Sequence, residues 1–136
     1  MTDLYSILQS RRYGEVRYTL TTERSGDMAN VLGKLGLKPE PGSLVEHNRE
    51  SALAILRELL WKDMAYESEC MPKERAESLA QDFFQQHSSQ GCRYFSNGNW
   101  SARESWNPLT GSTFDSGIII KTPENVYACV WFQDED

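Results

Sequence analysis

The sequence predicts an α+β fold in which helices pack on one face of a mainly antiparallel sheet, formed largely by the C-terminal third. Residues 113–120 and 126–132 are rich in β-branched and aromatic side chains, and turn-forming residues at 121–125 separate them. This pattern is typical of a β-hairpin. Helical spacing of apolar residues, by contrast, is concentrated in the first 90 residues. The 136 residues are expected to form one domain, 1–136, with a core that needs no disulfide.

The N-terminal segments alternate between helix and strand signals. A short helix is predicted over residues 4–11, followed by a strand over 15–22, where apolar and polar side chains alternate. Continuation of the first helix through the strand segment is the alternative. A second short helix is predicted over 28–35, before Gly36, and the two prolines of residues 38–42 favour a connector.

The strongest helical pattern in the chain follows Asn48, a candidate N-cap. Its apolar residues form a wide stripe, as in a helix that packs on a sheet: Ala52, Leu53, Ile55, Leu56, Leu59, Leu60 and Met64. We expect this helix to end at the Cys70-Met71-Pro72 segment. Another helix is predicted from Pro72, which suits a first turn, to about His87.

The last third begins with a predicted strand at residues 92–95, followed by Asn97-Gly98, a short hairpin signal. Residues 99–111 alternate poorly and contain Pro108, so they are expected to form a long ordered loop or a broken strand. Trp100 and Trp106 lie within it, and rings of this size are rarely left in water without a purpose.

Composition and charge restrict the classes of function. The net charge is -6: residues 1–38 hold 6 Lys/Arg and 4 Asp/Glu, while residues 39–136 hold 8 and 16. This balance argues against direct nucleic-acid binding and favours a basic protein partner, although such a charge also serves solubility alone. Three widely spaced cysteines, with no apolar run long enough to span a membrane, indicate a cytoplasmic protein with reduced thiols.

Few residues have the spacing that catalysis or metal binding requires. The only histidines, His47 and His87, have no local set of metal ligands, so neither a metal nor another cofactor is expected. His87 is better suited to a helix end. Nucleophilic catalysis by Cys92 with His87 is conceivable, but a buried structural thiol is the commoner case.

Asp115 interrupts an apolar strand beside Gly117. Such an acid must face solvent or find a partner. Pairing with Glu104 would suggest acid–base chemistry, and pairing with Arg103 a salt bridge. A structural role is the favoured interpretation.

The sequence also suggests residues for protein recognition. Aromatic and charged side chains alternate in the 99–111 loop, as in interface hot spots, although its rings could instead plug the end of the sheet. Residues 133–136 form an acidic tail directly after an apolar strand. This tail either prevents the strand from pairing with an exposed strand of another molecule or extends an acidic surface toward a basic partner. The residues expected to contact a partner are Glu67, Glu69, Trp100, Arg103, Glu104, Trp106, Asp134, Glu135 and Asp136.

The size, the acidic charge and the ending TFDSGIII…VYACVWFQDED resemble, in type, the bacterial immunity proteins that act against polymorphic toxins, including toxins of contact-dependent growth inhibition. The resemblance implies a non-enzymatic monomer or weak dimer that neutralises a cognate toxin, in many cases a basic nuclease, by stoichiometric binding. An accessory protein of phage or host defence would also bind protein. The alternative is a small enzyme or ligand-binding domain in which Asp115, Trp106 and His87 converge on a pocket between sheet and helices.

Overall fold

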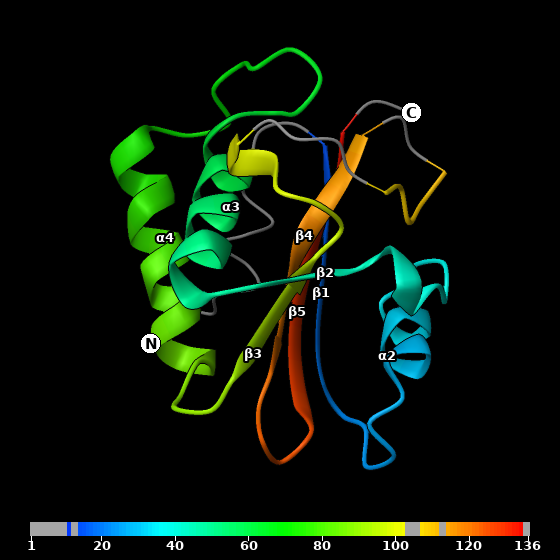
Figure 1. Ribbon diagram of the computed structural model, residues 1–136. Helices are drawn as coiled ribbons and strands as arrows, with labels where there is room; N and C mark the ends of the chain where they lie inside the picture. Colours follow the sequence, from blue (N-terminus) through cyan, green and yellow to red (C-terminus); the bar gives the residue numbers. More distant parts are fainter. Residues whose placement is uncertain (1–10, 12–13, 103–106, 112–113, 135–136) are drawn as a thin grey trace.

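A five-stranded antiparallel sheet forms the centre of the computed structural model, which describes residues 11, 14–102, 107–111 and 114–134 (Figure 1). The strands follow the order β1-β5-β4-β3-β2. Their bounds are β1 Glu15–Thr22, β2 Val45–His47, β3 Arg93–Ser96, β4 Phe114–Lys121 and β5 Val126–Asp134. The predicted α+β fold, with its C-terminal strands in the sheet, is confirmed.

The β4-β5 hairpin is the predicted one. The two strands pair from Phe114 with Asp134 to Lys121 with Tyr127. In the turn between them, the Thr122 carbonyl accepts a hydrogen bond of 3.0 Å from the Asn125 N–H, and Asn125 has a φ of 61°. Asparagine tolerates this left-handed conformation better than most residues, which explains its position in the turn. The hairpin then gains β1 on the outer side of β5.

Two helices, α3 (Arg49–Trp61) and α4 (Lys73–His87), cover one face of the sheet. As predicted, Asn48 caps α3: its Oδ1 accepts a hydrogen bond of 2.8 Å from the Ser51 N–H. The apolar stripes of both helices pack on Val16, Ile118, Ile120, Ala128, Val130 and Phe132 of the sheet.

The opposite face of the sheet carries α2 (Met28–Lys34) and the chain that follows it. The arrangement of α3 and α4 thus matches the expected helical layer, and α2 adds cover on the other side. The reason lies in β5, whose run of apolar residues points to both faces: Ala128 and Val130 toward α3 and α4, Cys129 and Trp131 toward α2. A strand that is apolar on both faces must be covered twice.

Helix α3 ends at Trp61, so the expected extension to Cys70 is wrong. The amide groups that would continue the helix bond elsewhere: the Asp63 N–H donates to the Ser68 carbonyl and the Met64 N–H to the Asp134 carboxylate. The Tyr66 N–H donates to the Asp63 side chain. Residues 62–70 therefore form a compact loop, hereafter the 62–70 loop.

The connection from β3 to β4 is long, and Asn97-Gly98 does not close a tight hairpin. Asn97 is buried and its Nδ2 donates to the carbonyls of Asn107 and Asp115, so it fastens the connection instead of turning the chain.

The predicted helix over residues 4–11 lies outside the described residues apart from its last position. Within the described ranges, no helix is both long and apolar enough to cross a membrane.

Candidate functional site: an interaction surface at the 62–70 loop

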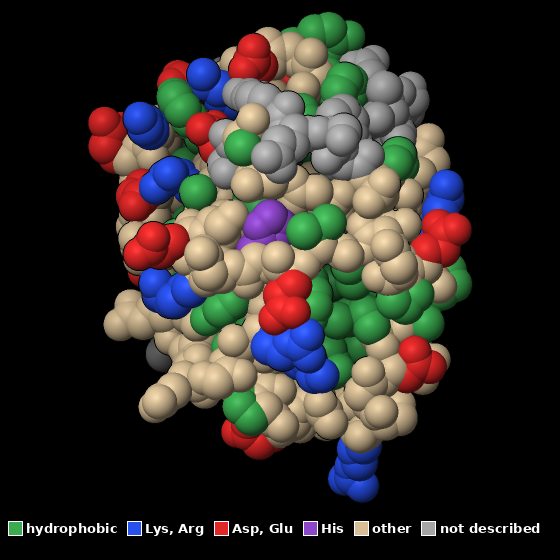
Figure 2. All heavy atoms as spheres, in the orientation of Figure 1, with side chains coloured by type: hydrophobic (Ala, Val, Ile, Leu, Met, Phe, Trp, Pro, Cys, Tyr) green, Lys and Arg blue, Asp and Glu red, His purple; other side chains and the backbone are tan. Residues whose placement is uncertain are grey.

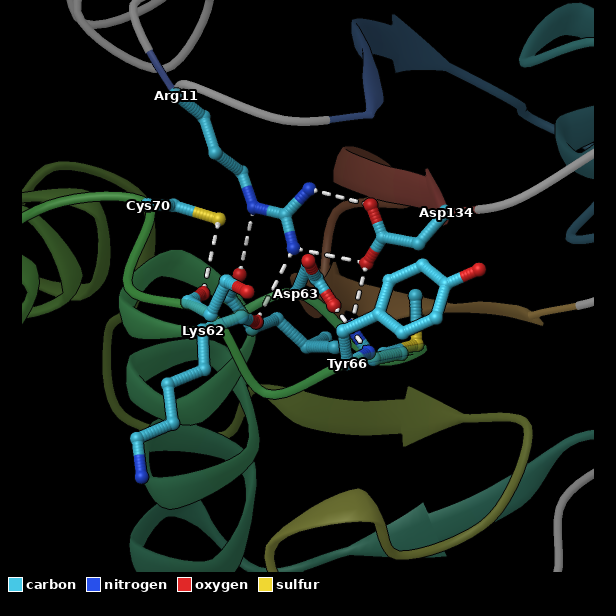
Figure 3. Close-up of polar contacts among 9 residues, drawn as sticks. Arg11, Lys62, Asp63, Tyr66, Cys70 and Asp134 are labelled. Carbon is cyan, nitrogen blue, oxygen red and sulfur yellow. Dashed lines mark hydrogen bonds and ion pairs between the residues drawn. The ribbon is translucent and has the colours of Figure 1, made fainter.

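A buried ion pair between Arg11 and Asp134 anchors the 62–70 loop (Figure 3). The guanidinium donates to both carboxylate oxygens, at 2.7 Å and 2.9 Å, and its centre lies 5.0 Å from the centre of the Phe132 ring. Neither side chain is more than 3% exposed. A bidentate pair in such a site is strong and directional, because little water competes for its hydrogen bonds.

The same two side chains bind the backbone on both sides of the loop's start. Arg11 donates to the carbonyls of Leu59 and Lys62, at 2.8 Å and 3.2 Å. Asp134 accepts a hydrogen bond of 2.9 Å from the Met64 N–H. We call this arrangement the Arg11–Asp134 clamp. It joins the end of β5, the last turn of α3 and the start of the loop.

Further hydrogen bonds fix the loop internally. The Asp63 carboxylate accepts from the Tyr66 N–H at 2.6 Å, and the Asp63 carbonyl from the Glu67 N–H at 3.1 Å. The Cys70 N–H donates to the Trp61 carbonyl at 2.7 Å, and Lys62 pairs with Glu69 in an isolated β-bridge. A loop with this many internal bonds holds its side chains in place before any partner arrives.

The loop presents an aromatic ring and two acids to solvent. Tyr66 is 72% exposed, the largest exposed fraction among the large hydrophobic side chains of the described residues. Glu67 and Glu69 on the same loop are also exposed. A rigid, exposed tyrosine beside charged groups is typical of an interface hot spot.

Trp61 connects the loop to the surface of α3 and α4. Its Nε1 donates to Glu69 at 2.9 Å, and the amino groups of Lys62 and Lys73 lie 4.1 Å and 5.0 Å from the centre of its ring system. Lys73 also lines a groove of about 510 Å³, hereafter the α3–α4 groove, together with Arg57, Glu58, Glu74 and Glu77. The loop and the groove thus form one continuous surface.

This surface is acidic on balance. It carries five glutamates, Glu58, Glu67, Glu69, Glu74 and Glu77, against three bases, Arg57, Lys62 and Lys73. Hydrogen bonds from Gln81 and then Arg57 lower the pKa of Glu77 below its ordinary value, so this carboxylate stays ionised at neutral pH. Excess negative charge around an aromatic side chain complements a basic protein surface.

The residues expected from the sequence to contact a partner are distributed unevenly. Glu67 and Glu69 lie on the exposed loop. Asp134 is 2% exposed and belongs to the clamp, so it is not part of an exposed acidic tail. Trp100 is 7% exposed and packs edge-on against Phe114, with 6.4 Å between ring centroids, which is the plugging role considered as the alternative. The other predicted contact residues lie outside the described residues: Arg103, Glu104, Trp106, Glu135 and Asp136.

Asp115 is fully buried, and uncharged donors surround its carboxylate. Oδ1 accepts from Trp131 Nε1 at 3.1 Å and from Asn97 Nδ2 at 3.0 Å. Oδ2 accepts from the hydroxyl and the N–H of Thr110, at 2.8 Å and 3.1 Å. The Leu109 N–H lies within 3.2 Å of both oxygens. The carboxylate thus fastens the 107–111 segment to the sheet, which is the structural role favoured from the sequence.

His87 and Asp115 do not converge on a pocket. Asp115 contacts Trp131 on the α2 face of the sheet, whereas His87 contacts Tyr18 and Phe83 on the α3–α4 face. Cys92 Sγ accepts a hydrogen bond of 3.2 Å from the Ser89 N–H, within its own turn, and shares a second one of 3.4 Å with the Ser89 hydroxyl. No group of three or more His, Cys, Asp or Glu side chains suited to a metal ion occurs among the described residues.

Two residues of the site escaped the sequence analysis. Tyr66 lies in a stretch that was expected to continue the helix, and the local signal against helix was that the apolar stripe stops at Met64. Arg11 carries no local signal, because its partners are 48 to 123 positions away.

No protein-family model matches the chain, and comparisons with curated proteins and with solved structures returned no match. The interpretation of the surface therefore depends on its own geometry.

Proposed function

We propose that this protein is a stoichiometric inhibitor that binds a basic protein through the 62–70 loop, in the manner of an immunity protein neutralising a cytoplasmic toxin. The exposed Tyr66 on a rigid loop, beside Glu67 and Glu69, is the observation that supports this proposal most directly. In the proposed complex Tyr66 is the central anchor, and the acids of the α3–α4 groove form a charged rim.

Preorganisation of the loop also favours a binding role. A loop that orders only on binding loses conformational entropy at that moment, which weakens the complex. Here the Arg11–Asp134 clamp and the Asp63 side chain already hold the backbone that carries Tyr66. Such a loop can bind without rearranging its backbone, as the loops of protease inhibitors do.

The charge of the surface suggests the chemistry of the partner. Five glutamates against three bases attract a positively charged surface and speed the encounter with it. Basic side chains are what a nuclease uses to hold phosphates, so carboxylates at this surface would occupy positions where phosphates lie in the substrate complex. A basic nuclease is therefore the partner we propose.

Affinity capture from the native host, followed by mass spectrometry, tests the proposal. The wild-type protein is compared with Tyr66→Ala and with Leu20→Ala, which removes another exposed apolar side chain, 53% exposed on β1. We expect a basic protein that binds the wild type and Leu20→Ala in a 1:1 complex and loses its activity there. Its affinity for Tyr66→Ala should be weaker by about 2 kcal/mol, roughly thirtyfold.

Two results would contradict the proposal. One is equal affinity of the captured partner for Tyr66→Ala and Leu20→Ala, which would show that the interface does not include the 62–70 loop. The other is turnover of a small compound by the purified protein, lost on replacing a single side chain, which would identify an enzyme.

A further inference from the structure

A second cavity lies on the other side of the sheet. It has a volume of about 400 Å³ and opens between the start of α2, the short β2 strand and the adjoining ends of β3 and β4. Figure 2 shows this face, where apolar side chains line a depression beside basic and acidic groups. We call it the α2 pocket. Its size suits a small molecule or a single chain end, since ligand sites typically measure about 300–1,000 Å³.

The wall of the α2 pocket is apolar on one side. Met28, Leu44 and Phe95 line it and pack against the buried cluster that holds Tyr127 and Trp131. These side chains are only partly buried, so they offer apolar surface to a ligand. Apolar lining with a few polar groups at one end is the usual composition of a small-ligand site.

The sheet register places the charged groups of the pocket in one row. Arg93 on β3 pairs with Lys121 on β4, and Lys121 pairs with Tyr127 on β5, so the three side chains lie on the same face. Arg93 is already neutralised: it donates to both oxygens of Glu46, at 2.9 Å and 2.7 Å, and lies over the Phe95 ring. This bonding lowers the pKa of Glu46.

The other two members of the row have unused donors. Within the described part of the chain, no carboxylate lies within 4.0 Å of the Lys121 amino group, which is 5.9 Å from the centre of the Tyr127 ring. Tyr127 itself is fully buried and does not line the pocket, and its hydroxyl has no hydrogen-bond partner among the described residues. Of the three charged side chains that line the pocket, Glu46 and Arg93 pair with each other, which leaves the charge of Lys121 unbalanced. The pocket therefore has an excess of positive charge.

We propose that the α2 pocket binds a carboxylate attached to a small apolar group. The carboxylate pairs with the Lys121 ammonium. The apolar group covers Met28, Leu44 and Phe95. A free carboxylic acid and the C-terminal residue of a peptide share this chemistry, and either would occupy the pocket in the same orientation.

This site is independent of the proposed inhibitor function. The α2 pocket opens on the α2 face of the sheet, whereas the α3–α4 groove lies between the helices that cover the other face. Variants of Tyr66 therefore test one proposal and variants of Lys121 the other.

Titration of the full-length protein by calorimetry and by amide NMR shifts tests the inference, with two matched pairs of probes. The first pair is phenylacetate and phenylacetamide; the second is an acetylated short peptide ending in leucine, with a free or an amidated C-terminus. We expect at least one acid to bind about tenfold more tightly than its amide, the discrimination that a charged hydrogen bond gives. A preference for acid over amide in the first pair identifies a small acid as the ligand. The same preference in the second pair identifies the C-terminal end of a peptide.

Variants assign the carboxylate contact. Lys121→Met, which keeps an apolar stem, should abolish the preference for acid over amide, while Lys38→Met, at an exposed lysine outside the pocket, should retain it. Equal binding of acid and amide, no binding of either acid, or an unchanged preference in Lys121→Met would overturn the proposal.

Discussion

Arg11 and Asp134 lie 123 positions apart in the chain, and two hydrogen bonds of 2.7 Å and 2.9 Å join their side chains in the interior. The pair also binds the Leu59 and Lys62 carbonyls and the Met64 N–H, which a longer α3 would have used within the helix. The clamp therefore decides where α3 ends, and with it the position of Tyr66. The stability of the fold and the shape of the proposed interface depend on the same ion pair.

Replacing Asp134 by Asn should destabilise the protein by about 3–5 kcal/mol, because the Arg11 guanidinium stays buried without an opposite charge. Urea denaturation followed by tryptophan fluorescence measures the change. Glu124→Gln, which removes a carboxylate from the exposed β4-β5 turn, should unfold at the wild-type midpoint. A wild-type midpoint for Asp134→Asn would show that the pair contributes little.

Asp115→Asn should lower the free energy of unfolding by about 3 kcal/mol. The amide would direct N–H groups at donors such as Trp131 Nε1 or the Thr110 hydroxyl, which then lose their acceptor inside the core. The measurement is thermal or urea unfolding, with Asp82→Asn on the exposed face of α4 as the matched control. Equal stability of the two variants would contradict the role given to Asp115.

Gly117 should not tolerate a side chain. A Cβ at this position would collide with the Val130 carbonyl oxygen and lie 2.6 Å from Trp131 Cε3, on the neighbouring strand. We expect Gly117→Ala to cost more than about 2 kcal/mol through overpacking. Gly42→Ala, where nothing lies within 4 Å of the added carbon, should leave unfolding unchanged. Equal stability of the two variants would show that β4 and β5 do not approach each other this closely at Gly117.

The stability of the protein should fall below neutral pH in part through His87. Burial against Phe83 and Tyr18 lowers the pKa of His87 from its ordinary value of 6.5, so the unfolded chain binds the proton more readily than the folded one. His87 therefore destabilises the fold increasingly as pH falls from about 6.5 toward the lowered pKa, and has no such effect above that range.

Denaturation of the wild type and His87→Gln across this range measures the effect. The drop in stability on acidification should be smaller in His87→Gln than in the wild type. Identical pH dependence in the wild type and His87→Gln would rule out a contribution from His87.

Charge reversal on the loop should slow association with the captured partner. Glu67→Lys weakens the attraction of a basic surface, so the association rate at low ionic strength should fall several-fold and depend less on salt. Glu124→Lys carries the same change of charge at the β4-β5 turn and should associate as the wild type does. At high salt the rates of all three proteins should converge, because exposed charges are then screened.

Local patterns predicted most of the elements. Alternation identified β1, the turn residues between β4 and β5 identified the hairpin, and Asn48 marked the start of α3. The structural role of Asp115 also follows from its position inside an apolar strand, where an acid needs a partner. These features depend on neighbours in the chain, where spacing alone indicates which side chains share a face. The end of α3 was missed, because apolar spacing continued to Met64 while the competing hydrogen bonds came from distant residues.

By itself the sequence determined the α+β class, the antiparallel hairpin and the acidic charge, since these follow from periodicity, turn chemistry and composition. Tertiary structure alone decided that Asp134 is an internal ion-pair partner, that Trp100 is packed inside and that Tyr66 is exposed on a fixed loop. The physical reason is that burial of a charge depends on a partner supplied from elsewhere in the chain. Arg11 supplies it, and no pattern within a few residues of either side chain records that contact.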